Sequence, residues 1–474
     1  MIERLENPVF RQSSRQRMRG ARTYGCLLAY LLILSLVVII SYEQFVSIGA
    51  QRSTTGLAQA LFDTLTVTQW FLVAFITPAL TTAAITMERE QRTIDLLMIT
   101  PLSRFAIVWG KFASALAFVV VMILCGMPLV AVLFLMGGVD LTAVLERYVG
   151  MLVTGALLAA FGLMMSAICS TSTLANLVTY GSLGVLGVLY VMGELVGTAV
   201  VMSRVFGGSA VSGFPFVGGL TAWQIWVFIA VLVVLAIGLL LQIAANYLLA
   251  DPRIGAWKTR VLTALLYLCV LSALTVATRA GGSGVTGGNL MVAVALTLLM
   301  PVGVAVATGV PMTGRKWYQW LYPRALGVGT VQSGLLFLWL LLAVAVVADQ
   351  FLPVRIRSTS QSWYYAVGYL WWLWSLGYAC STLIRNRWGA GTALVGGLGV
   401  LAQFVTILVE PLGRRHLETL LNLATPAALF ASGNAPRDMV LWVNLYPVLG
   451  LLVSAGTAWI RHMRERRRQT EVNR

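Results

Sequence analysis

Long runs of apolar residues constrain this chain more than any other feature of its sequence. The runs are about 18 to 28 residues long, and a helix needs about 20 apolar residues to cross the roughly 30 Å hydrocarbon core of a bilayer. Hydrophobic residues make up 59% of the chain and charged residues 11%, whereas an average soluble domain has about 25% charged residues. The sequence therefore predicts an all-α, polytopic membrane protein.

The apolar runs predict about twelve membrane-spanning helices, with both termini in the cytoplasm. With the N-terminus inside, 24 Lys and Arg residues fall on the cytoplasmic side and nine fall outside. Cytoplasmic loops of membrane proteins carry this excess of positive charge, so the charge bias supports the N-in, C-in arrangement. The expected spans are residues 24–41, 64–86, 112–136, 146–169, 175–197, 222–248, 259–277, 289–310, 329–348, 363–384, 389–410 and 438–460.

The same loops explain the net charge of +16, because cytoplasmic Lys and Arg lie against anionic lipid headgroups. A nucleic-acid-binding protein would need a folded basic domain, and no soluble segment here is longer than about 27 residues. We therefore expect membrane lipids, and no nucleic acid, as partners. We expect no metal site, since the five cysteines lack metal-ligand spacing and there are only two histidines.

The expected spans fall into two sets of six, which indicates a duplicated unit. Spans 3 to 6 and spans 9 to 12 start 214 to 217 residues apart, and each set has a long outer segment before its last span. We expect a six-helix domain over residues 1–250 and a second, degenerate six-helix unit over residues 251–474. Coincidence is the alternative, because loops of similar length occur in any helical bundle.

The first twenty residues are too polar to span the membrane. Leu5, Val9 and Phe10 provide a modest apolar face, and several Arg residues provide a basic one. This pattern is typical of a helix that lies in the headgroup region, and a disordered basic leader is the alternative. These residues lack the apolar core of a cleavable signal peptide, so we expect none.

The cytoplasmic stretch after the second span, residues 87–111, is the most unusual part of the sequence. It begins with two acidic and two basic residues between positions 88 and 92, and an apolar run follows. Pro101 disfavours helical geometry at the residue before it. We therefore expect a short helix over about 88–99, a turn that starts at Pro101, and entry into the third span through Lys111. Within that helix Arg92 would lie four residues after Glu88, a spacing that suits an ion pair.

This stretch, EREQRTIDLLMITPLSRFAIVWGK, resembles the cytoplasmic signature of type-2 ATP-binding-cassette (ABC) exporter permeases. In that family an acidic–basic stretch precedes Thr, a Leu-Leu pair, a Thr-Pro-Leu-Ser turn and a Gly-Lys before span 3. The segment NPVFRQSSRQRMRG and the six-span layout of residues 1–250 are also similar to such permeases. The matching positions are Glu88, Arg89, Glu90, Thr93, Leu96, Leu97, Thr100, Pro101, Leu102, Ser103, Gly110 and Lys111.

The resemblance implies a permease subunit that exports an unidentified substrate across the plasma (inner) membrane of a prokaryotic cell. A separate ABC ATPase (nucleotide-binding) subunit would bind ATP and Mg, and this chain would hold no cofactor and no catalytic residue. Two such chains could form a homodimer, or one chain could form a pseudo-dimer, which we favour because twelve spans equal two times six. The residues expected to couple to the ATPase subunit are Glu88, Arg89, Glu90, Arg92, Thr93, Leu96, Leu97, Pro101, Leu102 and Ser103.

The second half departs from this pattern at the equivalent connector, PMTGRKWYQWLYPRALG. This segment contains no Glu or Asp and is about eight residues shorter than the first connector. Its aromatic residues could form an altered ATPase contact or an interfacial aromatic belt, and we favour the belt.

The sequence leaves two other functional classes open, an ion-coupled carrier or channel and a membrane enzyme that acts on lipid-linked substrates. An ATPase is not among them, because we find no phosphate-binding GxxxxGK[ST] sequence. Ion-coupled carriers usually have ionisable groups deep in the membrane, and the middle of these spans offers only uncharged polar groups. Thr66, Thr68, Gln69 and Asn176 are candidates for a translocation path, and helix-packing hydrogen bonds are the alternative.

Overall fold

The structure is a computed structural model, and it describes residues 8–18, 21–47, 54–94, 102–137, 139–196, 222–248, 256–280 and 331–350, with isolated positions at 367, 448, 452–453, 456 and 463. Every described element is an α-helix, which confirms the predicted all-α fold. Among the described residues, five helices are long and apolar enough to cross a membrane. The spans expected at 289–310, 363–384, 389–410 and 438–460 lie outside the described residues, so the total of twelve stays a prediction.

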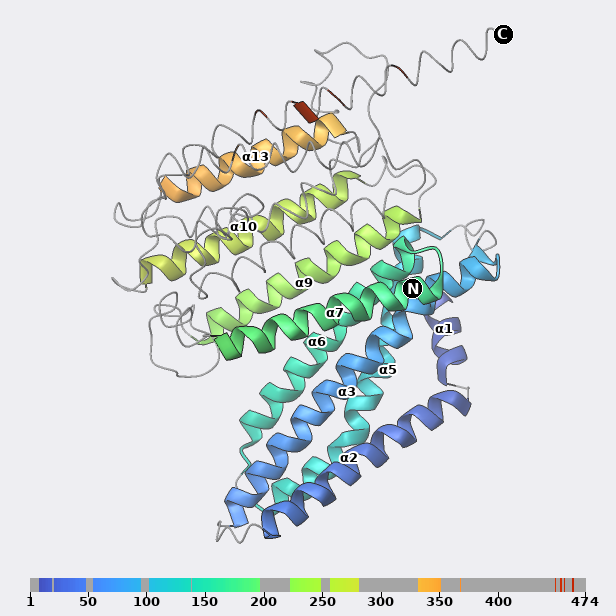
Figure 1. Cartoon of the computed structure of the whole chain (residues 1–474), viewed down its shortest axis with the longest axis vertical. Coiled ribbons are helices and arrows are strands. Elements are labelled where there is room, and N and C mark those ends of the chain that lie inside the picture. Colours follow the sequence, from blue (N-terminus) through green and yellow to red (C-terminus); the bar gives the residue numbers. More distant parts are fainter. Residues whose placement is uncertain are drawn as a thin grey trace, which may run out of the picture. The chain divides into compact units, whose positions relative to one another are not determined.

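The described helices coincide with eight of the expected spans (Figure 1). They are α2 (Ala21–Ser47), α3 (Thr54–Glu90), α5 (Arg104–Leu135), α6 (Leu141–Ile168), α7 (Ser172–Val196), α9 (Ala222–Tyr247), α10 (Ala256–Ala280) and α13 (Val331–Gln350). Helix α3 contains 37 residues, which corresponds to about 55 Å at 1.5 Å per residue. It is therefore long enough to extend beyond the hydrocarbon core.

The chain divides into two compact units. Unit 1 comprises Met1–Gly184 and Val233–Ala250, and unit 2 comprises Val185–Leu232 and Asp251–Arg474. Within unit 2, α10 packs against α13, and the Arg260 guanidinium lies 5.9 Å from the ring centre of Phe337. Both residues are near the starts of their helices, so α10 and α13 run in the same direction. This direction agrees with the single intervening span expected at 289–310.

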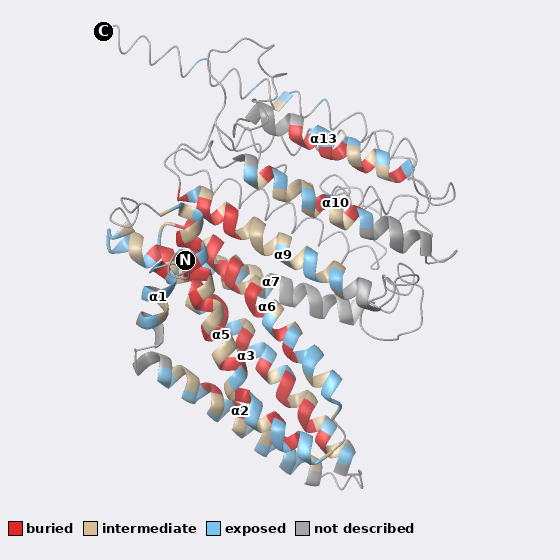
Figure 2. Cartoon of the chain, turned by 180° about the vertical axis from the view of Figure 1, so that it is seen from behind, coloured by how far each residue is buried: buried red, intermediate tan, exposed pale blue. Residues whose placement is uncertain are grey.

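Buried residues lie along α3, α5 and α6 of unit 1 (Figure 2), and the apolar ones form two clusters. The Met122 cluster joins α2, α3, α5 and α6 and includes Tyr30, Leu34, Leu65, Val73, Phe118, Met122, Tyr148 and Met151. The Leu163 cluster joins α3, α5, α6 and α9 and includes Ile85, Val108, Phe112, Ala160, Leu163, Leu241 and Ala244. Small residues on α6 allow close helix approach, as is common between membrane helices; a Cβ on Gly155 would lie 2.8 Å from the Val119 side chain.

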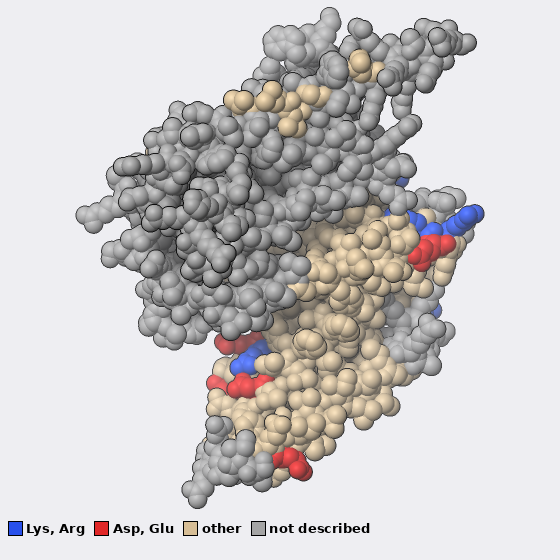
Figure 3. Space-filling model, viewed as in Figure 1, with Lys and Arg blue, Asp and Glu red and all other residues tan. Residues whose placement is uncertain are grey.

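Charged side chains of unit 1 lie toward the ends of its helices, and the visible surface between them is uncharged (Figure 3). The central segments 64–87 of α3, 112–135 of α5 and 148–168 of α6 contain no charged residue. A band without charge that extends across neighbouring helices is what a lipid hydrocarbon core requires. The chain is thus a multi-pass membrane protein.

Helix α1 (Pro8–Met18) forms where the interfacial N-terminal helix was expected, and it packs against α5. Val9 is buried within unit 1, whereas Phe10 is exposed. The alternative of a disordered leader therefore does not hold for residues 8–18, while Leu5 lies outside the described residues. The contact with α5 places this helix against the helix that follows the connector at residues 91–103.

Candidate functional site

Helix α3 ends at Glu90 in a Schellman motif, which the sequence did not reveal. Arg92 has a φ of 57°, the N–H of Arg92 donates to the Arg89 carbonyl at 3.2 Å, and the N–H of Thr93 donates to the Glu88 carbonyl at 2.9 Å. This pair of bonds around a left-handed residue closes a helix. The expected helix over 88–99 is therefore wrong at its start, because residues 88–90 form the last turn of α3. Residues 95–101 lie outside the described residues.

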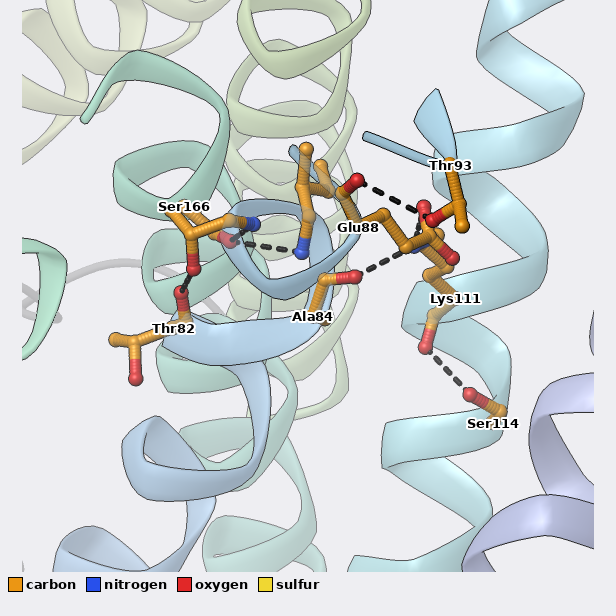
Figure 4. Close-up of polar contacts among 9 residues, drawn as sticks. Thr82, Ala84, Glu88, Thr93, Lys111, Ser114 and Ser166 are labelled. Carbon is orange, nitrogen blue, oxygen red and sulfur yellow. Dashed lines mark hydrogen bonds and ion pairs between the residues drawn. The ribbon is translucent and has the colours of Figure 1, made fainter. Parts of the chain in front are cut away.

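Glu88 forms an ion pair with Lys111 of α5, at 2.5 Å between Oε2 and Nζ (Figure 4). The Lys111 side chain is 4% exposed, and its Nζ also donates to the Ala84 carbonyl at 2.5 Å. The expected pairing of Glu88 with Arg92 within one helix is wrong, because the Schellman turn carries Arg92 away from α3. Lys111 is also two turns inside α5 rather than at its entry, since α5 begins at Arg104.

Arg89 connects α3 to the end of α6. Its Nη2 donates to the Ala167 carbonyl at 3.0 Å, and its Nη1 donates to the Cys169 carbonyl. The last carbonyls of a helix have no partner within the helix and carry partial negative charge. The Arg89 guanidinium therefore donates hydrogen bonds to two backbone carbonyls at the C-terminal end of α6.

Glu90 connects α3 to the start of α7. Its Oε1 accepts a hydrogen bond from the N–H of Ser172 at 2.6 Å, and the Ser172 hydroxyl donates to the Thr86 hydroxyl at 2.9 Å. A carboxylate is favourable at a helix N-terminus, where N–H groups are unpaired. The last turn of α3 is thus bonded to both sides of the α6–α7 turn.

The sequence missed three residues of this cluster, namely Ser166, Cys169 and Ser172. The Ser166 hydroxyl accepts hydrogen bonds from the N–H groups of Ile85 and Thr86, at 2.9 and 3.1 Å. The only local signal was the short connector after α6, whose Ser and Thr residues suit a helix N-cap. Nothing in the linear pattern indicated that this connector lies against α3.

The other residues predicted to couple to an ATPase subunit are distributed around the connector. Thr93 and Arg92 are exposed, and Leu102 is half-buried. Ser103 caps α5, because its hydroxyl accepts a hydrogen bond from the Ala106 N–H at 3.2 Å. Leu96, Leu97 and Pro101 lie outside the described residues.

Gln69, a candidate for the translocation path, is fully buried between three helices. Its Nε2 donates to the Tyr30 hydroxyl of α2 at 3.1 Å, and its Oε1 accepts from the Tyr148 hydroxyl of α6 at 3.2 Å. A Cβ on Gly126 of α5 would lie 1.9 Å from Gln69 Nε2. This geometry favours the helix-packing alternative for Gln69.

The other three path candidates also have partners within unit 1. The hydroxyls of Thr66 and Thr68 donate to the carbonyls of Phe62 and Thr64 on their own helix, at 2.7 and 2.8 Å. The side-chain oxygen of Asn176 on α7 accepts from the Thr82 hydroxyl of α3. Thr66, Thr68, Gln69 and Asn176 therefore all form hydrogen bonds within one helix or between neighbouring helices.

Residues 8–206 match a family model described as ABC-2 family transporter protein. The match contains α1 to α7, the Glu88–Lys111 pair and the α6–α7 turn. No curated protein and no solved structure matches the chain. This part of the chain therefore has the character of an ABC-2 type permease, a transmembrane component of a transporter.

Proposed function

We propose that this ABC-2 type permease is the membrane-spanning subunit of an ABC exporter, and that a separate ABC ATPase subunit binds it at residues 88–103. The observation that carries the proposal is the anchorage of the connector between α3 and α5. The Glu88–Lys111 pair joins the last turn of α3, where the connector leaves, to α5 two turns after the connector returns. A force applied to the connector would therefore act on both helices together.

In this mechanism ATP and Mg bind to the partner, and closure of its ATPase domains displaces the connector. The Glu88–Lys111 pair makes the ends of α3 and α5 move together, while Arg89 and Glu90 carry the movement to α6 and α7. Exporters of this kind switch access between the two sides of the membrane. We place the protein in the plasma (inner) membrane of a prokaryotic cell, with a substrate whose identity is open.

The isolated chain is expected to hydrolyse no ATP, because its sequence has no loop that could hold the phosphates. An ATPase subunit should co-purify with the tagged chain from its native membrane, and phosphate release should depend on that subunit. The matched control is the same complex in which the lysine of the ATPase subunit's phosphate-binding loop is replaced by alanine. Hydrolysis by a preparation shown to be free of other proteins would contradict the proposal.

Both termini are expected to be cytoplasmic, which cysteine-accessibility labelling in intact cells can measure. Cysteines placed near Arg92, Lys258, Arg315, Arg385 and Arg467 should be protected from an impermeant reagent. Cysteines near Arg52, Arg204, Arg355 and Arg414 should react. The physical reason is the excess of positive charge on the cytoplasmic side, and labelling from outside at positions 92 or 315 would refute the arrangement.

A further inference from the structure

Helix α3 contains a proline within its membrane-spanning part, at Pro78. Proline has no N–H, so the carbonyl four residues earlier loses its helical partner, and the ring disfavours a straight helix. The Thr82 hydroxyl lies 2.9 Å from the Pro78 carbonyl and also faces the side-chain oxygen of Asn176. The Thr81 hydroxyl lies between the Thr77 and Pro78 carbonyls, at 3.1 and 3.3 Å. Such hydroxyl bonds to the helix backbone tend to bend a helix further.

A hydroxyl from α7 reaches the backbone of α3 at the same level. The Tyr180 hydroxyl donates to the Phe75 carbonyl at 2.7 Å. Residues 75 and 79 are the pair that a regular α-helix joins by its own N–H to carbonyl bond. The Tyr180 hydroxyl therefore shares the carbonyl to which the Ala79 N–H would donate, and competition of a side chain for a helix-ladder bond is a recognised cause of a helix kink.

A second hydroxyl, from α6, meets α3 two to three turns later. Ser166 accepts from the N–H groups of Ile85 and Thr86, which would otherwise be available to carbonyls four residues earlier. Gly162, one turn before Ser166, allows this approach, since a Cβ there would lie 2.1 Å from the Thr81 hydroxyl and 3.5 Å from the Pro78 Cα.

These contacts lie where α3 passes from the Met122 cluster to the Leu163 cluster. Val73 belongs to the first cluster and Ile85 to the second. We propose that residues 75–86 of α3 form a hinge, and that the hydroxyls of Tyr180 and Ser166, together with the Arg89 and Glu90 contacts at its end, hold the last turns of α3 in the position seen here. When the two hydroxyls leave, the segment after Pro78 changes its angle to the rest of α3.

The link from this hinge to the ATPase subunit rests on the proposed function, because α3 leads into the connector at residue 91. The hinge itself does not depend on the proposed function, so its test uses the full chain alone in lipid nanodiscs. Failure of the ATPase proposal would leave this result unchanged, and failure of the hinge would leave the ATPase proposal open to its own test.

The experiment measures distances between pairs of spin labels in a variant whose five cysteines are replaced by alanine. One pair joins the end of α3 to the start of α7, at Met87 and Leu174, and the control pair joins α3 to α6 at the Met122 cluster level, at Val67 and Leu152. All four side chains are exposed. Residue 87 lies about 13 Å beyond Pro78, so a kink change of about 20° would move it by about 5 Å.

We expect Tyr180→Phe combined with Ser166→Ala to add a population at the 87–174 pair that is shifted by about 5 Å. Pro78→Ala, added to this double variant, restores the missing N–H, and it should return the 87–174 distribution to one distance. The distance distribution of the 67–152 control pair should be the same in each variant as in the parent protein. Identical 87–174 distributions in the parent and the double variant would overturn the hinge. Equal changes at both pairs would also overturn it, because they would indicate loosening of the whole bundle.

Discussion

Replacing Glu88 with lysine is expected to reduce the stability of unit 1 by about 3 kcal/mol, because the buried Lys111 charge would lose its carboxylate partner and face a second positive charge. Lys111 is 4% exposed, so water cannot replace the lost carboxylate. The measurement is the thermal unfolding midpoint of the purified chain in detergent, followed by size-exclusion chromatography. Under the proposed function the same variant should also lose substrate-stimulated ATPase activity of the complex.

The exchanged variant, Glu88→Lys with Lys111→Glu, separates the two roles that Glu88 could have. If the carboxylate acts within the permease, the exchange should recover part of the stability and of the stimulated ATPase activity; recovery is partial because Lys111→Glu removes the donor to the Ala84 carbonyl. If Glu88 instead binds the ATPase subunit directly, the exchange should recover stability but not stimulation. A Glu88→Lys protein as stable as the parent would contradict the ion pair.

An exposed ion pair provides the matched control. Asp63 and Arg147 lie 2.8 Å apart, with side chains that are 48% and 43% exposed. Exposed pairs contribute about 0 to 1 kcal/mol, so Asp63→Lys should change the unfolding midpoint far less than Glu88→Lys. Both substitutions reverse one charge, and burial of the partner is the main difference between them.

Replacing Gln69 with leucine is expected to cost about 2 kcal/mol, because the hydroxyls of Tyr30 and Tyr148 would remain buried without this partner. The triple variant Tyr30→Phe, Gln69→Leu, Tyr148→Phe removes all three polar groups together. It should regain most of the lost stability, since replacement of every partner by apolar groups is nearly neutral.

This series also decides between the two interpretations of Gln69. A residue that only packs helices would affect transport in proportion to the loss of folded protein. A residue in a translocation path would change transport in the triple variant even when its stability is restored. Transport by the triple variant at the parental rate per folded molecule would exclude Gln69 from the path.

The sequence by itself determined the all-α fold and the location of the helices. Hydrocarbon thickness imposes a minimum length on every apolar run, so eight helices could be located without any knowledge of their neighbours, although α3 and α5 begin ten and eight residues before their expected spans. The sequence also indicated that residues 87–111 are a candidate functional segment, because a dense group of charges there interrupts the uncharged apolar spans on either side. The match over residues 8–206 agrees with that interpretation.

Only the tertiary structure decided which side chains pair. Spacing along one helix suggested Arg92 as the partner of Glu88, but α5 runs antiparallel to α3 and brings Lys111 to the same place. The end of α3 was missed because its Schellman motif has an arginine at the left-handed position, where glycine is the usual signal. The partners of Gln69, Ser166 and Arg89 depend on the rotation and register of packed helices. A linear pattern specifies which residues a helix contains, whereas the contacts arise when neighbouring helices bring distant residues together.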